Sequence, residues 1–256
     1  MSLREIFRIT RQTRILLIVL ALISLTGFTV AYFYYGERRR AEDPRVMPAR
    51  TKLAEYDRLI SRREYAAALQ LLDTVYRMYQ RTPGYRGSYE FGVIFNNRGS
   101  AYLSMALYDS ALTVEEKNQL FTLAEEQIMQ GIKCYEKWID SAGAMSREQI
   151  RVRITPFFDA HDSRLKGMNI TRIIRKRTDD IVNAQVETPR RLSVSYTNLG
   201  VLQRHQYRQE EAVQSYIEAI KLWKDNFTAR NNLNVLMGKP PEDRSFIDKL
   251  FPPKRL

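Results

Sequence analysis

The spacing of the apolar residues after position 48 restricts most strongly how this chain can fold. Apolar side chains recur three and four residues apart, as at Ala68, Leu72, Val75 and Met78, and no stretch alternates with a period of two. Proline is sparse in these segments, and glycine falls mostly at their ends. The spacing therefore predicts an all-α fold for the body of the chain.

A capping-box pattern marks the start of one long helix. Thr113 is followed three residues later by Glu116, so the threonine hydroxyl can accept from the third amide while the glutamate reaches back. We expect a helix of about 25 residues to begin there, since the apolar spacing continues without interruption.

Residues 15–35 form a different kind of segment, because they contain no charged residue. A helix of this length is roughly 31 Å long, which matches the hydrocarbon core of a bilayer. No small-residue cleavage pattern follows, which argues against a removable signal peptide. The segment predicts a transmembrane helix at the N-terminus, between an arginine-rich tail (1–14) and a charged linker (36–48).

The number of positive charges is nearly equal on the two sides of this anchor, because arginines flank it on both sides. The positive-inside rule therefore favours neither orientation strongly. The inverted orientation would carry a tail with four arginines across the bilayer: Arg4, Arg8, Arg11 and Arg14. We therefore expect a single-pass membrane protein whose C-terminal domain is extracytoplasmic, that is, periplasmic in a bacterial-type envelope.

Residues 193–226 carry the most regular pattern in the chain. Gly200 interrupts the first helical half, and alanines occupy the expected core face of the second half. Helices can approach closely where side chains are small, so we expect the glycine to face an alanine while a tyrosine fills the neighbouring gap. The residues of the pattern are Tyr196, Leu199, Gly200, Ala212, Tyr216 and Ala219.

This unit resembles the tetratricopeptide repeat (TPR), a 34-residue helix-turn-helix motif. Gln203 and Lys224 depart from the family pattern, which usually has tyrosine and proline there. The resemblance is looser in 49–141, where Gly99 and Ala124 stand like Gly200 and Ala212, and in 227–237, which is expected to be a capping helix before a proline-rich tail. The resemblance implies a TPR-like solenoid of helical pairs.

Residues 142–192 do not fit the repeat and are expected to form an irregular helical insertion with a long basic helix near 162–186. Between 146 and 191 there are eleven Lys and Arg against six Asp and Glu, in a chain of net charge +12. The basic residues could be a solvated helix face, contact an acidic partner or anionic lipid, or bind nucleic acid. Nucleic acid is least favoured, because aromatic residues are not interleaved. The candidate contacts are Arg172, Arg175, Lys176 and Arg177.

The resemblance also implies a concave face, lined by the first helix of each pair, that holds a peptide or a partner helix. An asparagine amide can donate to and accept from a peptide backbone, although a packing role for these asparagines is an open alternative. The candidate groove residues are Asn96, Asn97, Ser100, Thr197, Asn198, Val201, Arg204, Asn231 and Asn232.

The sequence offers no catalytic constellation, so we expect no enzyme activity, no metal and no cofactor. His161, Asp162 and Ser163 are adjacent and cannot form a nucleophile–base–orienter arrangement, which favours a solvated loop or a helix start. Two histidines and one cysteine cannot build a His/Cys metal cluster. Cys134 lies in an apolar helix and is expected to be buried and inert.

These patterns together predict a membrane-anchored helical-repeat scaffold or adaptor. It would bind a protein component of an envelope-associated assembly, such as a secretion, motility or translocation machine. The alternative is a membrane-tethered, chaperone-like module for extended exported chains, and an enzyme is a distant third.

Overall fold

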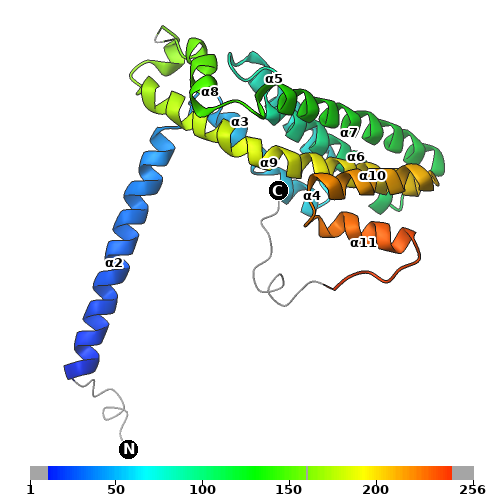
Figure 1. The fold of residues 1–256 in the computed structure, drawn as a ribbon, viewed down its shortest axis with the longest axis horizontal. Helices are drawn as coiled ribbons and strands as arrows, with labels where there is room; N and C mark the ends of the chain where they lie inside the picture. Colours follow the sequence, from blue (N-terminus) through cyan, green and yellow to red (C-terminus); the bar gives the residue numbers. More distant parts are fainter. Residues whose placement is uncertain (1–10, 160, 244–256) are drawn as a thin grey trace, which may run out of the picture. The chain divides into compact units, whose positions relative to one another are not determined.

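The computed structural model describes residues 11–159 and 161–243, and in this part every regular element is a helix (Figure 1). The predicted all-α fold is confirmed. Two units are distinguished, divided after Glu42. The first contains α2 (Arg11–Arg40). The second contains α3 (Met47–Leu53), α4 (Tyr56–Ser61), α5 (Tyr65–Arg81), α6 (Tyr89–Tyr108), α7 (Val114–Ala142), α8 (Arg147–Ile154), the 3₁₀ turns η1 (Thr155–Phe157) and η2 (Ser163–Leu165), α9 (Ile170–His205), α10 (Gln209–Leu222) and α11 (Phe227–Leu236).

Helix α2 exposes a continuous set of apolar side chains between Ile15 and Val30. Its two threonine hydroxyls, of Thr26 and Thr29, each donate to the backbone carbonyl four residues earlier, at 2.8 Å. In the described part of the chain, no helix is both long enough and apolar enough to cross a membrane. The arginine-rich tail predicted for 1–14 lies, up to residue 10, outside the described residues.

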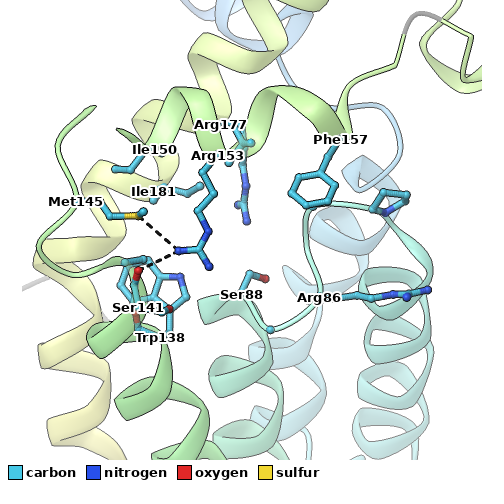
Figure 2. Close-up of a pocket in the computed structure, with 15 residues that line it drawn as sticks. Arg86, Ser88, Trp138, Ser141, Met145, Ile150, Arg153, Phe157, Arg177 and Ile181 are labelled. Carbon is cyan, nitrogen blue, oxygen red and sulfur yellow. Dashed lines mark hydrogen bonds between the residues drawn. The ribbon is translucent and has the colours of Figure 1, made fainter. Parts of the chain in front are cut away.

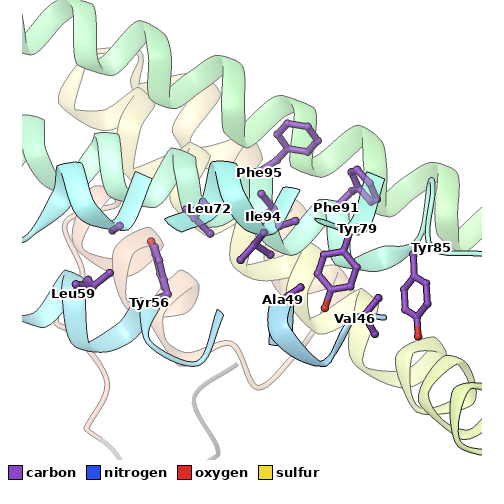
Figure 3. Close-up of a cluster of buried hydrophobic side chains, with 12 residues drawn as sticks. Val46, Ala49, Tyr56, Leu59, Leu72, Tyr79, Tyr85, Phe91, Ile94 and Phe95 are labelled. Atoms are coloured by element: carbon purple, nitrogen blue, oxygen red, sulfur yellow. The ribbon is translucent and has the colours of Figure 1, made fainter. Parts of the chain in front are cut away.

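The centre of the second unit is built from α6, α7, α9 and α10, which lie side by side (Figure 1). Helix α7 contacts both α6 and α9, and α10 contacts α9. A cluster of buried aromatic and aliphatic side chains joins α3, α4 and α5 to α6 (Figure 3). Tyr79 and Tyr85 are among its largest fully buried side chains. The pairs therefore share cores rather than standing alone, as expected of stacked helical repeats.

Helix α7 begins where the sequence predicts. The Thr113 hydroxyl accepts from the Glu116 amide at 3.2 Å, and the Glu116 carboxylate accepts from the Thr113 amide at 2.7 Å. The capping box is thus confirmed. Ser146 and Gln149 form a second one at the start of α8. That helix ends at Ile154, two residues before Pro156, which has no N–H to donate to a preceding carbonyl.

Helix α9 differs from the helix predicted for 162–186. It begins at Ile170, where the Asn169 side chain caps it, and is preceded by the two short 3₁₀ turns Thr155–Phe157 and Ser163–Leu165. It then continues to His205, so the expected border between insertion and repeat at residue 192 lies inside one helix. Pro189 lies inside this helix, where it has no N–H to donate and its ring crowds the carbonyl four residues earlier, yet the helix continues across it, packed against α7 and α10.

Candidate protein-binding surface

Gly200 lies at the close contact between α9 and α10, with Tyr216 as its nearest neighbour. A Cβ atom at position 200 would lie 2.6 Å from Cε1 of Tyr216, so the glycine makes room for the tyrosine ring. Ala212, Tyr216 and Ala219 are fully buried on the facing side of α10. The predicted packing role holds, and the atoms nearest to the glycine belong to Tyr216, the residue expected in the neighbouring gap.

The looser pair α6–α7 repeats this arrangement. A Cβ atom at Gly99 would lie 2.5 Å from Cγ1 of Ile128 and 3.0 Å from the carbonyl oxygen of Ala124. Gly131 lies against the backbone of Asn96, where an added Cβ would be 3.1 Å from the amide nitrogen. The correspondence of Gly99 with Gly200 is therefore structural as well as sequential, despite the longer connection between α6 and α7.

Two of the predicted groove residues are used inside the fold. Asn96 is 9% exposed, and its Oδ1 accepts from the Ser195 hydroxyl at 2.9 Å and from Asn198 Nδ2 at 3.2 Å. Thr197 is 4% exposed; its hydroxyl donates to the Ser193 carbonyl and accepts from Asn226 Nδ2. Asn96 and Thr197 join helices, and this burial corrects their assignment to an accessible groove.

The other predicted groove residues are all partly exposed: Asn97, Ser100, Asn198, Val201, Arg204, Asn231 and Asn232. Asn97 lies with Asn96, Tyr56 and Arg191 on a cavity of about 180 Å³ between α4, α6 and α9. The Tyr56 hydroxyl donates to the Asn97 carbonyl at 2.7 Å, which ties α4 to α6 beside this hollow.

Asn231, on α11, holds a segment of backbone. Its Nδ2 donates to the carbonyl oxygen of Glu242 at 3.2 Å, and its Oδ1 accepts from the Glu242 amide at 2.8 Å. The Glu242 carboxylate lies 3.2 Å from Nε of Arg230. One asparagine amide thus satisfies both backbone groups of a residue that lies outside any helix, which is the kind of recognition expected of the groove.

The basic candidates of α9 separate into different environments. Arg175 is exposed, and Lys176 is mostly buried and forms an ion pair with Asp180. Arg172 is half-buried and its amide donates to the Asn169 cap. Arg177 is 2% exposed, and its guanidinium donates to the Glu90 carboxylate and lies over the Tyr85 ring at 4.0 Å.

The expectation that Arg177 contacts an acidic partner or lipid headgroups is therefore wrong, because its charge is consumed inside the protein. Burial by itself raises the pKa of Glu90, but the charge of Arg177 outweighs this, and the pKa lies below its usual value of 4.5. A signal in the sequence could have revealed the burial. Arg177 stands in the stripe Ile173, Ile181, Ala184, at helical spacing, and all of these residues are buried.

The remaining chemistry-bearing residues have structural surroundings. Asp162 accepts hydrogen bonds from the side chain and the amide of Arg164, which lower its pKa to about 2. Cys134 is half-buried rather than buried, and the pKa of its thiol is raised by desolvation. Among the described residues, no group of His, Cys, Asp and Glu is arranged to hold a metal ion.

Comparison with known proteins adds one finding to this geometry. The family model of the tetratricopeptide repeat matches residues 192–227, which comprise the end of α9, α10 and the turn before α11. No curated protein and no solved structure matches the chain. The match covers the predicted repeat, and a TPR motif indicates protein–protein interaction.

Proposed function

We propose that this chain is a membrane-anchored helical-repeat scaffold that binds a protein partner on the face formed by α6, the end of α9, and α11. The observation that carries the proposal is the pair of hydrogen bonds between the Asn231 amide and the backbone of Glu242. It is an example, within the chain itself, of non-helical polypeptide held by a first-helix asparagine.

Asn97 and Asn232 offer the same chemistry on this face and are partly exposed, as is Asn198, whose Nδ2 already donates to Asn96. Amide groups that are hydrogen-bonded to water in the free protein can exchange that water for a peptide backbone at little cost in free energy. Side chains that face away, such as Tyr216 and Ala212, are occupied in holding the pair together. A partner with an extended segment would therefore find backbone-binding groups on this face.

The anchor is proposed from the uncharged segment 15–35 and from the exposed apolar side chains of α2. Hydroxyls that bond to their own helix, as those of Thr26 and Thr29 do, are compatible with an apolar surrounding. The four tail arginines favour an extracytoplasmic C-terminal domain. A scaffold in an envelope-associated assembly follows from this placement. A tethered chaperone-like module is the second candidate, because backbone recognition does not select side chains.

Site-specific photocrosslinking in cells tests the binding face. A photoreactive residue at position 97 or 232 should crosslink to one recurrent partner, whereas the same residue at exposed position 118 on α7 should not. Asn97→Ala with Asn232→Ala should weaken capture by about 0.5–1.5 kcal/mol for each lost bond, with Asn118→Ala as the matched control. Many weak partners would favour the chaperone-like module, and equal crosslinking from position 118 would exclude this face.

The anchor is tested by a separate experiment, whose outcome does not depend on the binding face. Alkaline phosphatase fused after residue 256 should be active, and a reporter that fluoresces only in the cytoplasm should be dark. The opposite pattern would show an inverted orientation, and recovery of the chain in the soluble fraction would exclude the anchor.

A further inference from the structure

A cavity of about 320 Å³ lies outside the repeat unit, at the end of α7 (Figure 2). Its walls come from the loop between α5 and α6, the last turn of α7, helix α8, the turn η1 and the first half of α9. The volume falls at the lower end of the range for pockets that hold small molecules.

The deep part of the cavity is apolar. Trp138, Ile150, Ile154 and Ile181 line it, and none of them is more than 8% exposed. Phe157, which is 43% exposed, closes one side and lies directly over Gly84, where an added Cβ atom would be 2.8 Å from that of Phe157. An apolar body of one aromatic ring or a short alkyl chain would be desolvated here.

Arg177 brings an unsatisfied donor to this apolar wall. Its Nη1 and Nη2 atoms donate to Glu90, whereas its Nε has no hydrogen-bond partner although the side chain is 2% exposed. Glu90 fixes the position of the Arg177 side chain in this wall. Ser88, which is 7% exposed, adds a hydroxyl to the same wall.

The charge of the lining has one sign. The 15 lining residues include Arg86, Arg153 and Arg177 and no carboxylate, and Glu90, which is not a lining residue, balances the charge of Arg177. Arg153 crosses the mouth, where its Nη1 donates to the Ser141 carbonyl at 2.9 Å and contacts the Met145 sulfur at 3.5 Å (Figure 2). Since a guanidinium has five N–H donors, these contacts leave donors for a ligand.

We propose that this cavity binds a small carboxylate with an aromatic or short aliphatic body. The body lies against Trp138 and Ile181, and the carboxylate accepts from the guanidinium of Arg153 at the mouth. Arginine suits a carboxylate because its planar donors match both oxygens. The inference is separate from the groove, because no lining residue belongs to the proposed protein-binding face.

Trp138 provides a direct readout, because Trp223 is the only other tryptophan in the sequence. In the full chain carrying Trp223→Phe, reconstituted in nanodiscs, 3-phenylpropionate should change Trp138 emission saturably. The neutral isostere 3-phenylpropionamide should bind at least about tenfold more weakly, since it lacks the charge that the arginines recognise. Propionate alone should give no saturable change, because it lacks the apolar body.

Arg153→Gln should weaken 3-phenylpropionate about tenfold, whereas Arg151→Gln, an exposed arginine on the same helix that does not line the cavity, should leave affinity unchanged. Equilibrium dialysis with labelled 3-phenylpropionate, corrected with empty nanodiscs, counts bound ligand independently of emission. The proposal is overturned if dialysis finds no saturable binding, if the amide binds as tightly as the acid, or if the two arginine variants behave alike.

Discussion

Helix α9 packs against its neighbours in two different ways along its length. In its C-terminal part, from Ser193 to His205, small side chains bring α10 close, and the Ser193 hydroxyl donates to the Ala219 carbonyl at 2.6 Å. In its N-terminal part, charged side chains join it to distant elements, through Arg177 to Glu90 and through Asp180 to Arg50. One continuous helix therefore belongs to the repeat at one end and to an ionic core at the other.

The difference shows why the two ends differ in sensitivity to mutation. Close packing of small residues fails when volume is added, whereas a buried ion pair fails when one charge is removed. Changing one end of α9 while leaving the other intact therefore tests this contrast.

The largest effect is expected from Arg177→Gln. The substitution leaves the Glu90 carboxylate, which is 5% exposed, without its cation, and should lower the free energy of unfolding by about 3–5 kcal/mol. Denaturant unfolding followed by circular dichroism measures this. The double variant Arg177→Met with Glu90→Leu should recover most of the loss, because it leaves no buried charge unpaired. If the double variant is no more stable than Arg177→Gln, the charge is not the cause.

Protonating Glu90 at low pH should lower the free energy of unfolding by no more than Arg177→Gln does. The pKa of Glu90 in the folded chain lies below 4.5, its usual value, so the stability it contributes is complete above pH 4.5 and is lost as pH falls through the lowered pKa. The wild-type free energy of unfolding should therefore fall more steeply below pH 4.5 than that of the double variant. Asp162 and Asp180 titrate in both proteins, so the difference isolates Glu90. Parallel pH curves would contradict the assignment.

Gly200→Leu should destabilise the other end of α9 by about 1–3 kcal/mol, because the added atoms meet the Tyr216 ring. In a Tyr216→Ala background the same substitution should cost less, since the ring is gone and the gap can accept the leucine. The two unfolding free energies, measured as a double-mutant cycle, report the contact directly. Equal costs in both backgrounds would show that Gly200 and Tyr216 do not share this space.

The sequence predicts the C-terminal part of α9 better than the N-terminal part for a physical reason. Gly200 and Tyr216 are sixteen positions apart, and their contact depends on spacing within one helical hairpin, which a pattern can reveal. Arg177 and Glu90 are 87 positions apart, and nothing local specifies that they meet. Composition made the N-terminal part look like a basic surface, although the apolar stripe around Arg177 indicated a buried face.

The candidate site divides along similar lines. The predicted asparagines lie on α6, α9 and α11, and the Asn231 amide bonds to the backbone of Glu242 within the same chain. The burial of Asn96 was not predictable from its own repeat, because it results from the approach of Ser195 and Asn198 on another helix. The cavity beside Trp138 was also not predicted, since its walls come from five separate segments.

The smallest effect is expected from Arg175→Glu, two residues before Arg177. Consecutive residues are about 100° apart around a helix, so these two side chains point to nearly opposite sides. Arg175 is exposed, and reversing its charge should change the free energy of unfolding by less than about 0.5 kcal/mol and leave the far-ultraviolet circular dichroism unchanged.

Arg177→Glu, by contrast, would place a second carboxylate beside Glu90 and should unfold the N-terminal part of α9. Of these two arginines, only Arg175 is placed to contact an acidic partner or anionic lipid, and such a contact should weaken in Arg175→Glu at low ionic strength. A loss of more than 1 kcal/mol in Arg175→Glu would mean that both sides of the helix are ionic, and the contrast between the two ends of α9 would then have to be redrawn.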